Sequence, residues 1–175
     1  SELAKFRWVP AARGSWARDL GGDRLIDVCM IGTMYTSRAA AISVLLRSMP
    51  ITVLAGIGPV EEEFNTFYNM AKIALVVSCN GDLTHRAMNN LASGCLVVMD
   101  RNVQDAEKIG LRDRIHMLVF EDELTMVSQV QQALGSPEMR KIITERAKAW
   151  VAPHTWKSRC EYILEQCRLA EMKKN

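Results

Sequence analysis

The sequence of 175 residues lacks the patterns that mark several common classes of protein. It has no apolar run near the roughly 18 residues that a transmembrane helix needs. Its first residues also lack the basic and then apolar segments of a signal peptide. Its 22 basic and 20 acidic residues nearly balance, whereas nucleic-acid binding usually requires a strong basic excess. We therefore expect no membrane span and no nucleic-acid partner.

Patterns for metal binding and disulfide bonding are missing as well. The five cysteines form no C-x-x-C pair, and the three histidines belong to no H-E-x-x-H pattern. We therefore expect no metal site. An odd number of cysteines without a disulfide framework favours the reducing cytoplasm. Three cysteines in or beside expected strands are predicted to be small buried apolar residues: Cys29, Cys79 and Cys95.

One stretch, residues 72–100, has the pattern of a strand, a helix and a second strand. An apolar run at 73–77 leads into a polar turn at 78–82. A helix is expected from about Thr84, because Asp82 and Thr84 are both good N-caps. Gly94 ends it, and a second apolar run follows at 95–99. Two strands joined by a helix run parallel, so the stretch predicts a βαβ unit in a parallel sheet.

Ligands of parallel sheets bind beyond the carboxyl ends of the strands. The helix that begins near Thr84 points its free N–H groups and its positive dipole end to that place, and Arg86 lies one turn inside it. These features suit a phosphate or another anion. A purely structural interpretation stays open, in which Asp82 and Thr84 cap the helix and Arg86 is a surface charge.

Further apolar runs predict strands at 25–31, 51–55 and 115–120. Helices are expected at about 37–47, capped by Thr36 or Ser37, and at about 60–71, 121–134, 137–151 and 155–172, with Leu124 facing inward. Glycines after the first two strands, Gly32, Gly56 and Gly58, allow a ligand to approach the backbone closely. No G-x-G-x-x-G fingerprint is present, which argues against an NAD site. Arg38 is a candidate phosphate contact or a surface side chain. Arg101 and Asn102 are expected to lie closest to the site, because they follow the end of the strand at 95–99.

Alternating strands and helices predict the α/β class: a doubly wound, Rossmann-like parallel sheet of five or six strands, flanked by helices, with C-terminal helices. We assign this domain to residues 25–175. Residues 1–24 contain Trp8, Trp16 and several glycines but show no period. They are expected to form an irregular lead-in on the domain surface.

Two stretches carry a resemblance to a known family. The segment FYNMAKIALVVSCNGDLTHRAMNNLASGCLVVMDR resembles the core of the group 1 glycosyltransferases, more narrowly the branch of spore-maturation-type proteins and similar bacterial enzymes. A second segment, AKAWVAPHTWKSRCEYIL, is similar to the family's closing pattern at His154, Thr155 and Arg159. The residues that match the first pattern are Tyr68, Lys72, Asp82, Arg86, Ala92 and Gly94.

The resemblance implies the C-terminal half of a two-domain glycosyltransferase of the GT-B type. That half binds a nucleotide-sugar, an N-terminal domain of the same protein binds the acceptor, and reaction occurs between them. Diphosphate charge would be met by helix N-termini and Arg86 rather than by a required metal. No general base is evident, so the catalytic residues stay unknown. The implied donor contacts are Gly32, Thr33, Gly56, Gly58, Asn80, Asp82, Thr84, Arg86 and Asn89.

One position departs from the family pattern. Asn89 stands where the family usually has a glutamate that hydrogen-bonds the sugar or ribose hydroxyls, and an amide lacks the charge that strengthens such bonds. A non-catalytic relative that serves binding or assembly is therefore one alternative. A phosphate-sensing receiver domain is another, but it requires acidic residues after the first strand, and the segment 32–34 supplies none.

Overall fold

A single parallel sheet forms the centre of the molecule. The computed structural model describes residues 12–58, 61–103 and 105–172, and all five of their strands join this sheet in the order β2-β1-β3-β4-β5. The predicted doubly wound architecture is confirmed, with five strands. The strands are β1 (Ile26–Ile31), β2 (Val53–Gly56), β3 (Ala71–Val76), β4 (Leu96–Asp100) and β5 (Leu118–Phe120).

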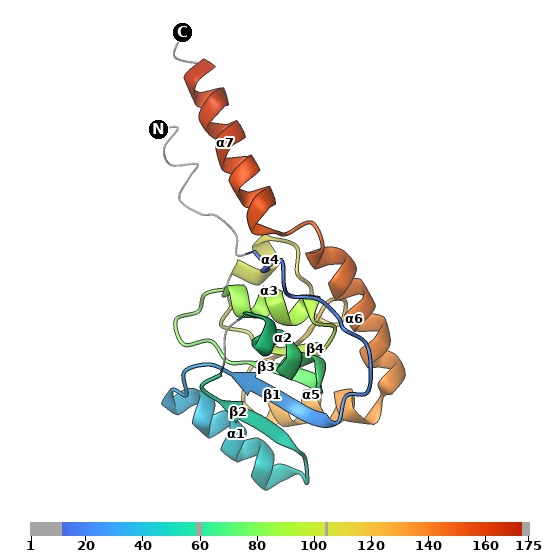
Figure 1. The fold of residues 1–175 in the computed structure, drawn as a ribbon. Helices are drawn as coiled ribbons and strands as arrows, with labels where there is room; N and C mark the ends of the chain where they lie inside the picture. Colours follow the sequence, from blue (N-terminus) through green and yellow to red (C-terminus); the bar gives the residue numbers. More distant parts are fainter. Residues whose placement is uncertain (1–11, 59–60, 104, 173–175) are drawn as a thin grey trace.

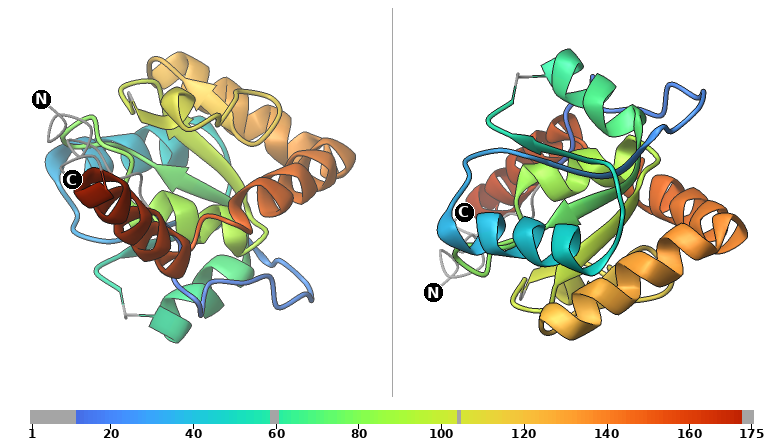
Figure 2. Two further views of the ribbon diagram at one scale, coloured as in Figure 1. Left: turned by 90° about the horizontal axis from the view of Figure 1, so that it is seen from above. Right: turned by 90° about the horizontal axis from the view of Figure 1, so that it is seen from below.

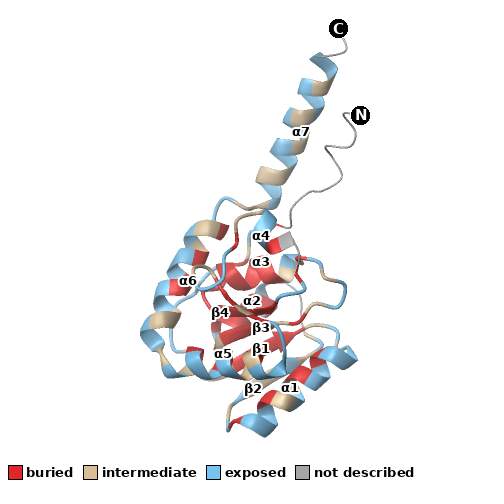
Figure 3. Cartoon of the chain, turned by 180° about the vertical axis from the view of Figure 1, so that it is seen from behind, coloured by how far each residue is buried: buried red, intermediate tan, exposed pale blue. Residues whose placement is uncertain are grey.

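Helices cover both faces of the sheet (Figures 1 and 2). α1 and α5 pack on one face, α2 and α3 pack on the other, and α6 packs against α3. Between these layers β4 is buried along its whole length, as Figure 3 shows for the centre of the fold. The helices are α1 (Thr36–Ser48), α2 (Glu61–Asn69), α3 (His85–Ala92), α4 (Asp105–Lys108), α5 (Glu123–Gly135), α6 (Pro137–Val151) and α7 (Trp156–Met172).

The predicted βαβ unit is confirmed as β3, α3 and β4. Thr84 is the N-cap residue of α3, and Met88 and Leu91 on the inward face are fully buried. Gly94 follows the helix with a φ of 73°, a left-handed conformation that glycine adopts without steric cost. Lys72 has the structural role expected of it, since its ammonium lies 2.7 Å from a carboxylate oxygen of Asp27.

Three local predictions are wrong. The N-cap of α1 is Tyr35, one residue before the expected Thr36 or Ser37. Leu124 is 82% exposed, because the buried stripe of α5 is formed by Met126, Val130 and Ala133, and Leu124 lies about 200° around the helix from Met126. Cys79 is exposed in the turn beyond β3, whereas Cys29 and Cys95 are buried as expected.

The described part of the lead-in, residues 12–24, is a strap whose first part, residues 12–17, packs into the fold. Ala12 and Ala17 of the strap are fully buried, and the ring of Trp16 meets the ring of Phe64 edge-on at 5.8 Å. The remainder of the expected lead-in, including Trp8, lies outside the described residues. The expectation of a surface segment is therefore wrong for residues 12–17, which contribute to the core although they show no period, whereas residues 18–23 are exposed as expected.

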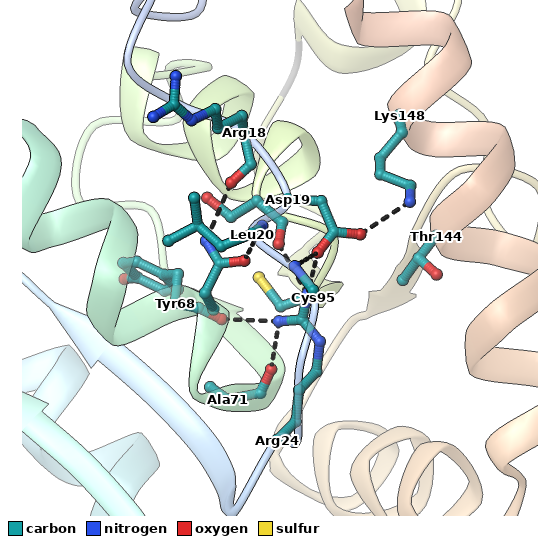
Figure 4. A network of polar contacts seen from close by, with 12 residues as sticks. Arg18, Asp19, Leu20, Arg24, Tyr68, Ala71, Cys95, Thr144 and Lys148 are labelled. Atoms are coloured by element: carbon teal, nitrogen blue, oxygen red, sulfur yellow. Dashed lines mark hydrogen bonds and ion pairs between the residues drawn. The ribbon is translucent and has the colours of Figure 1, made fainter.

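Polar contacts fix the strap at the edge of the sheet where the strands begin (Figure 4). Arg24 donates to the carbonyls of Tyr68 and Ala71, each at 2.9 Å, and forms an ion pair with Asp19 at 3.1 Å. Asp19 also lies 2.8 Å from the ammonium of Lys148 on α6. Although burial acts to raise it, the pKa of Asp19 is lowered by these cations and by the hydrogen bond from Gly21. The strap thus joins α2, β3 and α6.

α7 extends away from this body (Figures 1 and 3). All of its residues are described, and none of their side chains is buried. No helix in the described ranges is both long and apolar enough to cross a bilayer.

Candidate functional site

The connections of the sheet create a crevice between β1 and β3. The chain leaves β1 through α1 to the outer strand β2, and then crosses the opposite face through α2 to reach β3 on the other side of β1. The helices that follow β1 and β3, α1 and α3, leave the carboxyl ends of these strands on opposite faces of the sheet. Such a topological switch point is where open α/β sheets bind their ligands.

A large cavity of about 790 Å³ opens at this point on the side of α2 and α3. Its volume is typical of ligand pockets. Its walls combine apolar and aromatic side chains with a few polar groups. The residues that line it are Gly14, Ser15, Trp16, Ile31, Gly32, Thr33, Ile57, Gly58, Glu61, Phe64, His85, Arg86, Asn89 and Trp156.

Arg86 lies directly over the backbone at the end of β1. Its guanidinium donates to the carbonyl of Ile31 at 3.3 Å. Gly32 has a φ of 142°, and a Cβ added there would lie 1.6 Å from Nη1 of Arg86. Only glycine therefore accommodates both this backbone conformation and this position of the arginine.

The amino end of α3 faces the same cavity. Thr84 occupies the N-cap position, but its side chain makes no capping hydrogen bond, so the expectation that Thr84 and Asp82 cap the helix through their side chains is wrong. The N–H of Ala87 donates to the carbonyl of Thr84 at 3.1 Å, so the earlier N–H groups of the first turn and the positive dipole end are what α3 offers to an anion. His85 lines the cavity beside Arg86, and burial together with the charge of Arg86 lowers the pKa of His85. The site therefore combines one fixed cation with a neutral imidazole at neutral pH.

Asn89 forms part of the cavity wall but already has a structural partner. Its Oδ1 accepts a hydrogen bond from the backbone N–H of Gly14 at 2.7 Å, and the residue is only 2% exposed. Its backbone carbonyl accepts from the Ser93 hydroxyl at 2.9 Å. Asn89 thus ties the strap to α3, and the amide oxygen that the resemblance assigns to ligand hydroxyls is engaged by the protein.

A second cavity of about 600 Å³ lies on the α1 side and shares Arg86 with the large cavity. It receives three of the expected donor contacts, Asn80, Asp82 and Thr84. The large cavity receives Gly32, Thr33, Gly58, Arg86 and Asn89. Gly56 lines neither cavity, and instead its carbonyl accepts the N–H of Gly32 at 2.8 Å. The predicted donor contacts are therefore divided between two cavities, and Arg86 lines both of them.

Arg38 is not a surface charge. It is 9% exposed, and its guanidinium donates to the carbonyl of Val77 at 3.1 Å and to that of Thr33 at 2.8 Å. It also lies 5.4 Å from the centre of the Tyr35 ring. Arg38 therefore joins the loop after β1 to the end of β3 and forms part of the wall of the second cavity.

The expectation that Arg101 and Asn102 lie closest to the site is wrong. Neither lines the two cavities, and Arg101 pairs with the exposed Glu121 at 2.8 Å. Asp100, just before them, accepts hydrogen bonds from the N–H groups of Ser78 and Asn102, and burial raises the pKa of its carboxyl group. Asp100 thus joins the loop after β4 to the loop after β3, whose Ser78 lines the second cavity.

Several cavity residues lie outside the predicted contacts, among them Trp16, Trp156, His85 and Glu61. Trp16 and Trp156 come from the strap and from the start of α7, which only long-range packing brings to the crevice. His85 precedes Arg86 directly and could have been inferred from the same helix start. Glu61 begins α2 and is recognisable in the sequence only as a favourable charge for the helix dipole.

The two segments that carry the resemblance mostly support the structure around the site. Tyr68 is buried, its hydroxyl accepts the N–H of Ile31 at 2.9 Å, and burial raises its pKa. Thr155 caps the first turn of α7 through the N–H of Ser158 at 3.1 Å. His154 stacks on Trp150 at 4.1 Å and contacts Arg159. In the described residues, no group of three or more histidine, cysteine or acidic side chains could hold a metal ion.

A doubly wound sheet with an arginine and an open helix N-terminus at its switch point is the arrangement with which α/β proteins bind anionic ligands. The chain belongs to the glycosyl transferase-like family, whose model matches residues 35–165. No curated protein sequence matches it.

Solved structures of glycosyltransferases share the fold. The C-terminal domain of the group 1 glycosyl transferase LpcC from Francisella tularensis has a TM-score of 0.56 at 12% identity, over 72% of this chain and 84% of that domain. TarM from S. aureus, in complex with UDP among other ligands, has a TM-score of 0.70 at 10% identity, over 94% of this chain and 41% of TarM. The T4 phage enzyme BGT, in complex with UDP-glucose, has a TM-score of 0.61 at 12% identity, over 88% of this chain and 51% of BGT. The chain thus spans about half or less of the latter two proteins.

Proposed function

We propose that this chain is the donor-binding half of a glycosyltransferase and that the large cavity takes the nucleoside diphosphate part of a nucleotide-sugar. The observation that carries the proposal is the placement of Arg86 over Gly32 at the amino end of α3. The match to the glycosyl transferase-like family and the nucleotide-bound structures of similar fold support it.

The proposed contribution to catalysis is electrostatic. When a glycosyl group leaves its donor, negative charge develops on the diphosphate. The guanidinium of Arg86 and the first-turn N–H groups of α3 are fixed in advance where that charge would form, so they stabilise it with little reorganisation. We propose that no metal is required for this step. The acceptor and a general base would come from an N-terminal domain of the same protein, so we expect the chain alone to bind a donor without transferring its sugar.

The narrower assignment is also a proposal. The matched residues suggest the bacterial branch that includes spore-maturation-type proteins. All five cysteines are free, which suits a reducing compartment, and we propose the cytoplasm.

One observation favours a second candidate, a non-catalytic glycosyltransferase-like domain for binding or assembly. The side-chain oxygen of Asn89, at the position where the family usually has a glutamate, is bonded to Gly14 rather than open to a ligand. A domain that has lost donor binding could keep this residue for structure alone.

Calorimetric titration with uridine, guanosine and adenosine diphosphates separates the two candidates. We expect one of them to bind. Arg86→Met should then weaken its affinity about 10- to 100-fold, since a hydrogen bond to a charged group contributes about 1.5–3 kcal/mol. Arg101→Met is the matched control, because this exposed arginine lines neither cavity. If none of the three nucleotides binds, the non-catalytic candidate is favoured. If Arg86→Met and Arg101→Met weaken nucleotide binding equally, the nucleotide does not bind at Arg86.

A further inference from the structure

The large cavity has a single carboxylate among the described residues that line it, that of Glu61. A carboxylate in a site for an anion weakens binding by repulsion unless it lies away from the anionic part of the ligand and accepts hydrogen bonds there. In this cavity Glu61 would therefore have to contact hydrogen-bond donors of a bound nucleotide that lie away from its phosphates.

The topology places Glu61 away from the anionic end of the cavity. Arg86 comes from α3 and lies over Gly32, at the end of β1. Glu61 follows β2, the edge strand on the opposite side of β1 from β3 and α3. Both residues line the large cavity, so a nucleotide that places its phosphates at Arg86 and fills the cavity toward α2 brings its nucleoside to Glu61. The first donor groups beyond the phosphates are the hydroxyls of the ribose.

The backbone of Glu61 supports a role at this wall. Its φ is 54°, in the left-handed region that residues with a side chain rarely adopt. Strained positions of this kind cluster at ligand-binding sites, where the surrounding structure holds them in place. The helix dipole of α2 does not require the strain, because Glu62 and Glu63 also lie in its first turn.

The side chain of Asn89 does not supply the acceptor for these hydroxyls. Its Oδ1 is occupied by the N–H of Gly14, so the side chain oxygen on the α3 wall is already bonded within the protein. Glu61 offers a charged acceptor in the same cavity, at the start of α2, and a carboxylate has two oxygens with which to receive a vicinal pair of hydroxyls.

We propose that the carboxylate of Glu61 accepts hydrogen bonds from the ribose diol of a nucleoside diphosphate bound in the large cavity, and so makes the site selective for ribonucleotides. This inference rests on the proposed donor-binding function. It assigns the specificity for the ribose to a residue of α2 rather than to Asn89.

The test compares each nucleoside diphosphate that binds with its 2′,3′-dideoxy form, which lacks the diol, by calorimetry on the full chain. The unmodified protein should bind the ribonucleotide roughly tenfold or more tightly than the dideoxynucleotide. Glu61→Gln should bring ribonucleotide affinity down toward the dideoxy level and leave the dideoxynucleotide affinity unchanged. Glu62→Gln, one residue further along the same exposed turn, is the matched control and should retain the selectivity.

The outcomes distinguish a failure of the ribose contact at Glu61 from a failure of the proposed donor-binding function. If the unmodified protein binds no nucleoside diphosphate, both are overturned. If Glu61→Gln binds ribonucleotide and dideoxynucleotide as the unmodified protein does, the inference alone is overturned. It is also overturned if the variant loses affinity only for an intact nucleotide-sugar, because Glu61 then contacts the transferred sugar.

Discussion

Replacing Gly32 by alanine tests the geometry on which the donor site depends. An alanine at a φ of 142° is strained, which costs about 1–3 kcal/mol. Its Cβ would lie 1.6 Å from Nη1 of Arg86 and must displace the guanidinium, so the bond to the Ile31 carbonyl is lost at about 0.5–1.5 kcal/mol. We expect a loss of about 2–4 kcal/mol in the free energy of unfolding, or about 5–10 °C in Tm. Nucleotide affinity should fall at least tenfold, since Arg86 moves.

Gly22→Ala is the matched control for this change. Gly22 also has a left-handed φ, 91°, but no atom lies within 4 Å of an added Cβ, so the variant has the backbone strain alone. Urea unfolding and calorimetric titration of both variants give the comparison. Both should lose stability, and only Gly32→Ala should lose affinity. Unchanged nucleotide affinity in Gly32→Ala would refute the placement of Arg86 as the anion contact.

Two further predictions concern stability. Arg38→Met removes the donors to the carbonyls of Thr33 and Val77 and should cost about 2–4 kcal/mol in urea unfolding. Arg47→Met, at the exposed end of the same helix, should stay within about 0.5 kcal/mol, and equal losses would contradict the structural role of Arg38. Burial and neighbouring arginines lower the pKa of all three histidines, His85, His116 and His154. Because the unfolded chain then binds more protons, their contribution to stability is present above about pH 6.5 and is lost as the pH falls through the lowered values. Tm should therefore decrease between pH 7.5 and 5, and a constant or rising Tm would contradict these shifts.

Much of the sheet was predictable because local chemistry and tertiary packing agree there. The apolar runs around α3 are too short for anything but buried strands, and Gly94 has the left-handed conformation that its position after a helix suggests. Ser136 and Pro137 likewise begin α6 as their sequence indicates, with the Ser136 hydroxyl accepting the N–H of Met139 at 3.3 Å. At these positions the local sequence alone indicates the observed structure.

The site was predicted less completely because distant segments build it. Sequence spacing placed Arg86 at a helix start, but it gave no sign that Gly14 would bond Asn89 from 75 positions away. Arg38 resembled a surface charge, since the carbonyls that bury it belong to other elements. Trp156 is part of the cavity wall because α7 begins beside it, which depends on how the last helices pack.

The strap has a consequence for where this domain begins. A boundary at Leu25, just before the first strand, would remove Gly14 and Trp16 from the cavity wall. It would also leave the side-chain oxygens of Asn65, Asn69 and Asn89 without the backbone N–H groups that they bind. We expect a shortened protein of this kind to lose stability together with part of the cavity wall, so the smallest stable unit includes a segment with no regular secondary structure.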